Sequence, residues 1–347
     1  MKFLRFILYP LVPIYAFVIS IRNWLFEKGF FKSVTVNANV ISVGNITMGG
    51  SGKTPLVIYL TKLLKSENIN VGVLSRGYGR KSKGYLLVSD GYKMLVDVKQ
   101  SGDEIFQTAS ECNVPAAVCE NRVEGAKRLI EDTKVNTLVL DDAFQHRWIN
   151  RNIDLLICEQ QFLNDPSFFS QRLLPTGNMR ENYRSVNRAD AVIINKKFSE
   201  TLPLSDAIIK YGKDKNLFYS FYEVIGFVDA VKGTEYYVKD FEGQKSLIVS
   251  GIANPYSFIN ALKKTKVDTS NQIIFPDHKN YTLKEIQKIR SEFYKTNSHS
   301  VITTQKDSVK LIKYSDAFDD VEIFYLKIEL KMEDESGFKN FIFSKIN

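Results

Sequence analysis

A glycine-rich loop between an apolar strand and an amphipathic helix constrains this fold more than any other feature of the sequence. A β-branched run, Asn39–Val43, precedes the loop, and leucines at helical spacing follow it from Leu56 to Leu64. The loop consists of Thr47, Met48, Gly49, Gly50, Ser51, Gly52, Lys53 and Thr54. This order of strand, loop and helix predicts a phosphate-binding loop, although Thr47 stands where the general pattern has glycine.

The residue types of this loop suit a nucleotide triphosphate. Small residues let backbone N–H groups face phosphate oxygens, and the start of the following helix adds positive potential. Lys53 can bridge the β- and γ-phosphates, and the hydroxyl of Thr54 can bind Mg²⁺. The alternative is a glycine-rich turn that contains an incidental lysine.

A pair of carboxylates ends another apolar run farther along the chain. Leu138, Val139 and Leu140 lead directly into Asp141 and Asp142. Proteins with a phosphate-binding loop hold Mg²⁺ with carboxylates at the carboxyl ends of such strands. The pair therefore predicts a magnesium site, and the alternative is a strand that ends in an ordinary turn.

The pattern from Val34 onward predicts an α/β fold with a P-loop NTPase-like, mostly parallel sheet and flanking helices. Short β-branched runs alternate there with amphipathic stretches, as in βαβ units. Strands are expected at Asn39–Val43, Val71–Ser75, Ala116–Cys119, Thr137–Leu140, Leu155–Cys158 and Ala191–Ile194. Tyr85–Val98 alternates around Gly91 and predicts an inserted antiparallel hairpin.

A second, smaller α/β lobe is expected after the polar segment Ser199–Asn216. Its strands are expected near Leu217 and at Leu247–Ser250, Ile273–Phe275, Val301–Thr303 and Ile323–Leu326. We therefore predict three parts: an N-terminal segment over residues 1–33, a P-loop domain over 34–210 and a lobe over 211–347 that closes a cleft.

The N-terminal segment has the composition of a membrane-associated helix. The 16 residues from Phe6 to Ile21 carry no charge, and basic and aromatic residues follow them. A perpendicular span needs about 20 apolar residues, and Pro10 and Pro13 interrupt this run. The segment also lacks a small-residue cleavage site. We expect a retained helix in the interface or in one leaflet, and the alternative is a buried core helix.

The net charge and the cysteine and histidine content indicate which kinds of binding partner and metal site to expect. The 47 basic and 39 acidic residues leave a net charge of +8, which favours an anionic partner such as a phosphorylated substrate or a membrane surface. Three cysteines without a C-x-x-C pair and three scattered histidines exclude a disulfide framework and a zinc cluster. No nucleic-acid-binding module is recognisable, and no obligate protein partner is evident.

Several linked motifs, in order, resemble the tetraacyldisaccharide 4'-kinase family, the lipid A 4'-kinases. They are Val43–Thr47 with the loop itself, Ser75–Gly79, Gly102–Glu104, Asp141–His146, Leu174-Pro175 with Arg180-Glu181, Asp277-His278 and Lys306-Asp307. The sequence departs from the family's usual residues at Ala143, Asn178, Gln305 and Ser308. The resemblance implies transfer of the γ-phosphoryl group of ATP, with Mg²⁺, to the 4'-hydroxyl of an acylated glucosamine disaccharide 1-phosphate. It also implies action at the cytoplasmic face of the bacterial inner membrane.

The resemblance assigns roles to individual residues. It implies that Asp103 is the base or orienting group for the acceptor hydroxyl, with His278 beside it. Lys53 and Asp142 complete the catalytic set, and Thr54, Asp141, Asp142 and Glu181 are expected around the metal. Expected contacts of substrate or phosphate are Arg76, Arg122, His146 and Arg180, each of which could instead have a purely structural or surface role.

Two other classes of P-loop protein remain as alternatives. A membrane-recruited ATPase of the partitioning type needs a lysine where Met48 stands. A GTPase is suggested by Asn195-Lys196-Lys197-Phe198, but Phe198 cannot accept the hydrogen bonds that an aspartate accepts from guanine. A competition assay between GTP and ATP tests the GTPase alternative.

Overall fold

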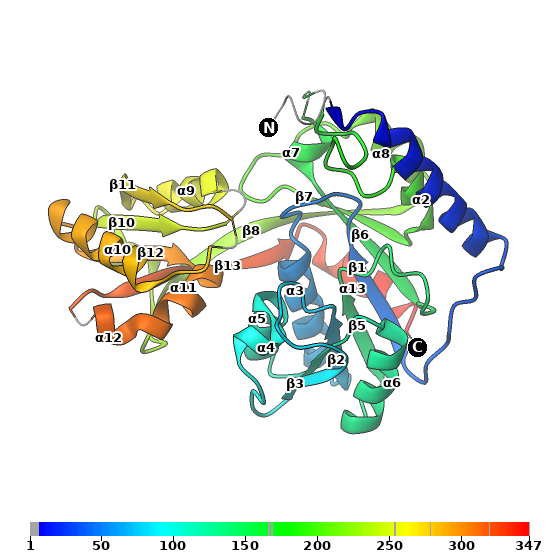
Figure 1. Cartoon of the computed structure of the whole chain (residues 1–347), viewed down its shortest axis with the longest axis horizontal. Helices are drawn as coiled ribbons and strands as arrows, with labels where there is room; N and C mark the ends of the chain where they lie inside the picture. Colours follow the sequence, from blue (N-terminus) through cyan, green and yellow to red (C-terminus); the bar gives the residue numbers. More distant parts are fainter. Residues whose placement is uncertain are drawn as a thin grey trace. The chain divides into compact units, whose positions relative to one another are not determined.

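The chain divides into two compact units (Figure 1). The structure is a computed structural model that describes residues 7–165, 167, 169–252, 255–277, 279–318 and 320–346. The first unit comprises Met1–Phe221 and Lys331–Asn347, and the second comprises Tyr222–Leu330. The C-terminal segment thus returns to the first unit, whereas the sequence suggested one C-terminal lobe from residue 211. Apolar packing holds the segment there, because Phe338 is fully buried and packs against the rings of Tyr59 and Phe218.

The sheet of the first unit is parallel except at one edge, which confirms the predicted mostly parallel sheet. Along the order β8-β7-β6-β1-β5-β2-β4-β3, every described pair is parallel except that of β3 with β4. Its strands are β1 (Asn39–Gly44), β2 (Val71–Ser75), β3 (Leu86–Asp90), β4 (Pro115–Val118), β5 (Thr137–Asp141), β6 (Ile153–Glu159), β7 (Ala191–Asn195) and β8 (Asn216–Asp229), the last of which continues into the second unit.

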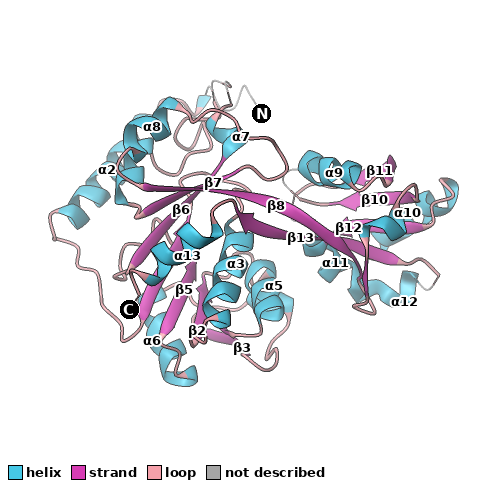
Figure 2. Ribbon diagram, turned by 180° about the vertical axis from the view of Figure 1, so that it is seen from behind, coloured by secondary structure: helices cyan, strands magenta, loops and turns pink. Residues whose placement is uncertain are grey.

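Helices cover this sheet because its central strands are apolar on both faces. Leu138 and Leu140 of β5 share a buried cluster with Ala126 and Leu129 of α6, while α3 packs against β1, β2 and β5. Helices α3 and α5 lie side by side (Figure 2). The helices of this unit are α2 (Leu11–Glu27), α3 (Lys53–Ser66), α4 (Val98–Ser101), α5 (Asp103–Cys112), α6 (Arg122–Thr133), α7 (Gln160–Leu163), η1 (Tyr183–Arg188), α8 (Asp206–Gly212) and α13 (Glu335–Phe343).

Strand order brings the two main motifs together. Strands β1 and β5 are neighbours, and Val43 lies opposite Asp141 in their register. The loop after β1 and the carboxylates after β5 therefore leave the sheet at the same edge. This is the carboxyl edge, where open α/β sheets bind their ligands.

The predicted hairpin over Tyr85–Val98 is wrong in its second arm. Strand β3 forms as expected, but it pairs antiparallel with β4. Residues after Gly91 return only as far as an isolated bridge between Ser89 and Met94. Asp97 then caps a helix, because its side chain accepts a hydrogen bond from the backbone of Gln100.

The N-terminal helix α2 lies on the surface of the first unit and has no buried residue. Its outer face is apolar: Ile14 and Phe17 are 61% and 66% exposed. In the described part of the chain, every helix is too short or too polar to cross a bilayer. The structure therefore gives no support to a membrane-spanning segment here.

In the second unit, strands β11-β10-β12-β13 pair in this order and in parallel, and a buried core surrounds Leu247, Ile289 and Val301. A short strand, β9, pairs antiparallel with the end of β8. The elements of this unit are β9 (Glu235–Tyr236), η2 (Val238–Phe241), β10 (Lys245–Ser250), α9 (Pro255–Lys264), β11 (Asp268–Ile274), α10 (Leu283–Lys295), β12 (Ser300–Thr304), α11 (Gln305–Leu311), η3 (Ile312–Tyr314), α12 (Ser315–Phe318) and β13 (Ile323–Met332), which ends in the first unit.

Replacing Gly44 by alanine should destabilise the first unit. An added Cβ would lie 2.6 Å from the backbone nitrogen of Phe144, so the end of β1 and the loop after β5 would have to separate. We expect the free energy of unfolding to fall by about 1–3 kcal/mol, measured by urea unfolding. The matched control is Gly212→Ala, whose Cβ would make an ordinary 3.6 Å contact with Ile208. Equal stability of the two variants would contradict this account.

Candidate active site

The phosphate-binding loop has the backbone that its sequence predicts. Gly49 and Gly52 adopt positive φ angles of 105° and 102°, and Gly52 immediately precedes the first residue of α3, Lys53. An added Cβ on Gly49 or Gly50 would meet nothing within 4 Å, so the loop has open space beside it. These features leave backbone N–H groups at the start of α3 available to an anion.

The side-chain amides of two asparagines fix the phosphate-binding loop by hydrogen bonds. The sequence pattern did not predict this role for either asparagine. The side-chain amide of Asn45 donates to the hydroxyls of Ser51 (2.8 Å) and Thr47 (3.3 Å). The amide of Asn195, at the end of β7, donates to the carbonyl of Ser51 at 3.0 Å. Both asparagines are fully buried. The position of each asparagine, at or just after the end of an apolar strand, was the only sequence feature that could have indicated this role.

Asp142 lies at the centre of a cluster of opposite charges. Its carboxylate accepts two hydrogen bonds from Nη1 of Arg180, at 2.8 and 2.9 Å, and lies 3.5 Å from Nζ of Lys53. Although burial opposes ionisation, Lys53 and Arg180 hold the pKa of Asp142 below its ordinary value. Asp142 has a positive φ of 49°, which turns the chain sharply after β5.

Asp141 has the opposite electrostatic environment. It is 2% exposed, its Oδ2 accepts a 3.3 Å hydrogen bond from Ser75, and its Oδ1 has no partner among the described residues. Burial, followed by the negative charges of Glu104 and Asp142, raises the pKa of Asp141 to about 7. The two adjacent carboxylates therefore differ in how readily they ionise.

Arg122 lies beneath the carboxylates and not on the open side of the loop. Its guanidinium is 2% exposed and donates to the backbone carbonyls of Cys119 (2.7 Å) and Asp141 (3.3 Å). Burial lowers the pKa of Arg122 to about 10. This position gives no support to the expected phosphate contact, because Arg122 supports the end of β5 from within the protein.

His146 is half-buried in the loop that follows the carboxylates. Burial, followed by the nearby charge of Arg122, lowers the pKa of His146 to about 4, so its imidazole is neutral at pH 7. Arg151 fixes the backbone of this loop by donating to the carbonyls of Ala143 (2.7 Å) and His146. Arg151 also pairs with Asp154 and is a positioning residue that the sequence did not reveal.

Glu181 is held by cations and donors of the protein. It is fully buried, and its carboxylate accepts from Arg22 (2.8 Å), Arg188 (2.7 Å), Ser185 (2.6 Å) and Asn23 (3.3 Å). Although burial opposes ionisation, these cations hold the pKa of Glu181 below its ordinary value. The geometry gives no support to the expected metal contact of Glu181.

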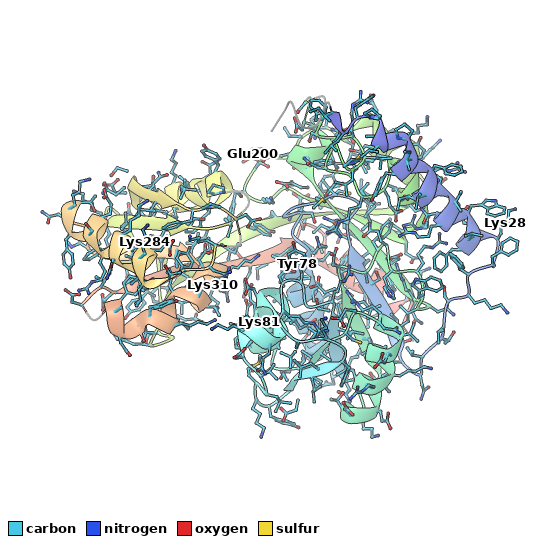
Figure 3. The ribbon with its side chains drawn as sticks, in the orientation of Figure 1. Lys28, Tyr78, Lys81, Glu200, Lys284 and Lys310 are labelled. Atoms are coloured by element: carbon cyan, nitrogen blue, oxygen red, sulfur yellow. The ribbon has the colours of Figure 1, made fainter. Side chains whose placement is uncertain are left out.

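Asp103 begins α5 at the same edge of the sheet as the carboxylate pair. The next residue, Glu104, acts electrostatically on Asp141, and Gly102 packs against the carbonyl of Tyr78. Tyr78 belongs to the exposed loop after β2, which also carries Arg76 (Figure 3). His278 lies outside the described residues.

The donor set suits a magnesium ion that arrives with a nucleotide. The described residues contain no group of three His, Cys, Asp or Glu side chains that could hold a metal by themselves. Mg²⁺ in phosphoryl-transfer enzymes is usually bound by one or two carboxylates together with substrate phosphates. Asp141, with an unpartnered buried oxygen, and Asp142 are of that type.

Comparison with known proteins agrees with these features along the whole chain. Residues 4–347 match the family model described as tetraacyldisaccharide-1-P 4'-kinase, LpxK. A tetraacyldisaccharide 4'-kinase of Cytophaga hutchinsonii is 34% identical over 319 residues, which cover 90% of this chain and 87% of the relative. One of Aquifex aeolicus is 33% identical over 342 residues, which cover 98% of each chain.

A solved structure extends the agreement to three dimensions. The crystal structure of the "apo" form of LpxK from Aquifex aeolicus in complex with ATP matches with a TM-score of 0.81 and 31% identity, covering 99% of this chain and 100% of that chain. The chain belongs to the tetraacyldisaccharide-1-P 4'-kinase family.

Proposed function

We propose that this chain transfers the γ-phosphoryl group of ATP to the 4'-hydroxyl of a tetraacylated glucosamine disaccharide 1-phosphate. The observation that carries the proposal is the meeting of Lys53, Asp142 and Arg180 beside an open phosphate-binding loop. Family membership supports the acceptor, and the ATP in the related crystal structure supports the nucleotide.

The loop and the carboxylate pair provide the site for ATP with Mg²⁺. Backbone N–H groups of the loop and of the start of α3 would face the phosphates, and Asp141, Asp142 and the hydroxyl of Thr54 are the groups that would hold the metal. Bound Mg²⁺ neutralises charge on the β- and γ-phosphates. Lys53 and Arg180 would stabilise negative charge on the transferred group. Both already pair with the same carboxylate, that of Asp142.

Asp103 is our candidate for the group that orients the acceptor hydroxyl. Phosphoryl transfer passes through a loose transition state, so positioning and charge stabilisation supply most of the rate. A carboxylate at the start of α5, on the same sheet edge as Asp141, is suited to accept the hydroxyl proton. Arg76 on the exposed neighbouring loop and the neutral His146 are candidates for contacts with substrate. His278 remains an expectation from the sequence.

The acceptor's acyl chains require the enzyme to work at a membrane surface, and α2 supplies a suitable face. Its exposed apolar residues recur at helical spacing: Leu11, Ile14, Phe17, Val18 and Ile21. Lys28, at the end of the helix, points away from the unit and can lie at headgroup level (Figure 3). We propose that α2 lies in the interface of the cytoplasmic leaflet of the inner membrane.

Lys53→Ala should abolish most of the transfer activity, because Lys53 is the cation expected to bridge the β- and γ-phosphates. We expect a loss of at least about a hundredfold in kcat/KM. The measurement is transfer of labelled phosphate from ATP to the acylated disaccharide in detergent with Mg²⁺. Lys62→Ala is the matched control, because Lys62 lies on the same helix and its ion pair, with Glu111 at 3.8 Å, is outside the loop. Full activity of the Lys53 variant would refute the proposed nucleotide site.

Asp103→Asn should separate binding of ATP from transfer of its phosphate. The amide cannot accept the hydroxyl proton, so kcat should fall by about a hundredfold or more. Affinity for Mg²⁺ with ATP, measured by calorimetry, should change less than about twofold, since Asp103 is not assigned to the nucleotide. Glu111→Gln, at the other end of α5, is the control. A variant that loses ATP binding and activity together would place Asp103 in the nucleotide site instead.

Replacing Ile14 and Phe17 by serine should weaken membrane binding. Each exposed apolar side chain that enters the interface contributes enough transfer free energy for about a tenfold change in affinity. The measurement is co-sedimentation with vesicles of phosphatidylethanolamine and phosphatidylglycerol. Tyr92→Ser removes an aromatic ring that is 96% exposed elsewhere and serves as control. If the double variant binds vesicles as the wild type does, α2 is not the membrane-binding face.

A further inference from the structure

Residues Asn178–Glu181 form a segment that pairs with the start of the phosphate-binding loop. The backbone nitrogen of Met48 donates to the carbonyl of Asn178 at 2.6 Å, and the nitrogen of Arg180 donates to the carbonyl of Ile46 at 2.7 Å. Thr47 and Met179 form an antiparallel bridge between these hydrogen bonds. Any displacement of this segment would therefore act directly on the loop.

The same segment delivers the arginine of the charge cluster. Arg180 makes its two hydrogen bonds to Asp142, whose carboxylate also pairs with Lys53. The backbone of Arg180 is thus fixed against Ile46, just after β1, while its side chain reaches Asp142, just after β5. Small shifts of this backbone would change the place of the guanidinium relative to Asp142 and Lys53.

Helix α2 holds the other side of the segment. The phenolic hydroxyl of Tyr15 donates to the backbone carbonyl of Arg180 at 2.9 Å. About two turns farther along α2, Arg22 donates to the buried carboxylate of Glu181 at 2.8 Å. The side chain of Asn23 adds a contact of 3.3 Å to the same carboxylate.

These polar contacts attach α2 to the first unit, although none of its side chains is fully shielded from solvent. No residue of α2 is buried, and its opposite face is apolar and exposed. At the C-terminal end of the helix, Arg147 donates to the carbonyl of Asn23 at 3.2 Å and lies over the ring of Phe26. The contacts of Tyr15 and Arg22 therefore join α2 to Arg180, which reaches Asp142, and to its neighbour Glu181.

We propose that Tyr15 and Arg22 are positioning residues for phosphoryl transfer, which act by holding Arg180 in place on Asp142. This inference rests on the proposed function in that it takes Arg180 and Asp142 as part of the nucleotide site. It makes α2 a part of the catalytic scaffold in addition to its proposed place at the membrane.

The first test measures transfer in detergent with saturating acceptor, so that membrane binding does not limit the rate. Tyr15→Phe removes one hydroxyl, and Arg22→Gln removes the cation beside Glu181. Each should lower kcat by about three- to tenfold, while the KM for the lipid stays within about twofold. Arg22→Lys should recover part of the loss because it keeps the charge. Tyr92→Phe and Ser20→Ala, both at exposed positions, are the controls.

A double-mutant cycle with Arg180→Gln distinguishes positioning from a merely structural role. If Tyr15 acts through Arg180, the loss caused by Tyr15→Phe should shrink to less than about twofold in the Arg180→Gln background. An equal loss in both backgrounds, or no effect on kcat in the wild-type background, would overturn the inference. If Arg180→Gln is too slow to assay, the same cycle on the affinity for ATP with Mg²⁺, measured by calorimetry, gives the same decision. That binding cycle also tests the inference if the wild-type protein fails to phosphorylate the lipid, a result that would count against the proposed function alone.

Discussion

The pairing of one carboxylate with two cations organises the whole candidate site. Asp142 binds Arg180 through two hydrogen bonds and keeps Lys53 within 3.5 Å, and these residues come from three separate segments of the chain. Two cations so close together would repel each other without an anion between them. Asp142 therefore keeps two cations beside the loop, where a triphosphate would need them. Its positive φ turns the chain sharply after β5.

The neighbouring carboxylate, Asp141, differs from Asp142 because one of its oxygens lacks a hydrogen-bond partner in the described structure. Asp141 is buried with one unpartnered oxygen in the described structure, and Arg122 reaches its backbone carbonyl and not its carboxylate. Burial, followed by the negative charges of Glu104 and Asp142, raises its pKa to about 7. A bound divalent cation would compensate the charge of Asp141 and would lower its pKa. With no group of three metal-binding side chains among the described residues, the pair suits a magnesium ion that enters with the nucleotide.

Local patterns predicted those parts of the fold that depend on neighbouring residues. The strand before the loop, the loop itself and α3 are each determined within a few residues, and their positions are confirmed. Contacts between distant segments were not predictable in the same way. The alternation in Tyr85–Val98 could not show that β3 would pair with β4, and the apolar spacing around Phe338 could not show that α13 would pack against Tyr59 and Phe218. Glu181 is the clearest case, because its partner Arg22 lies 159 residues away.

Arg180 and Glu181 are neighbours in the chain, yet their side chains serve different parts of the protein. Arg180 donates to Asp142, whereas Glu181 accepts a hydrogen bond from Arg22 of α2. A helix that only attached the enzyme to a membrane would not require a buried carboxylate beneath it. Removing Arg22 would leave that carboxylate with fewer compensating charges, and a buried charge without its partner is costly. The polar side of α2 therefore belongs to the same electrostatic network as the phosphate-binding loop, whereas its apolar side faces outward.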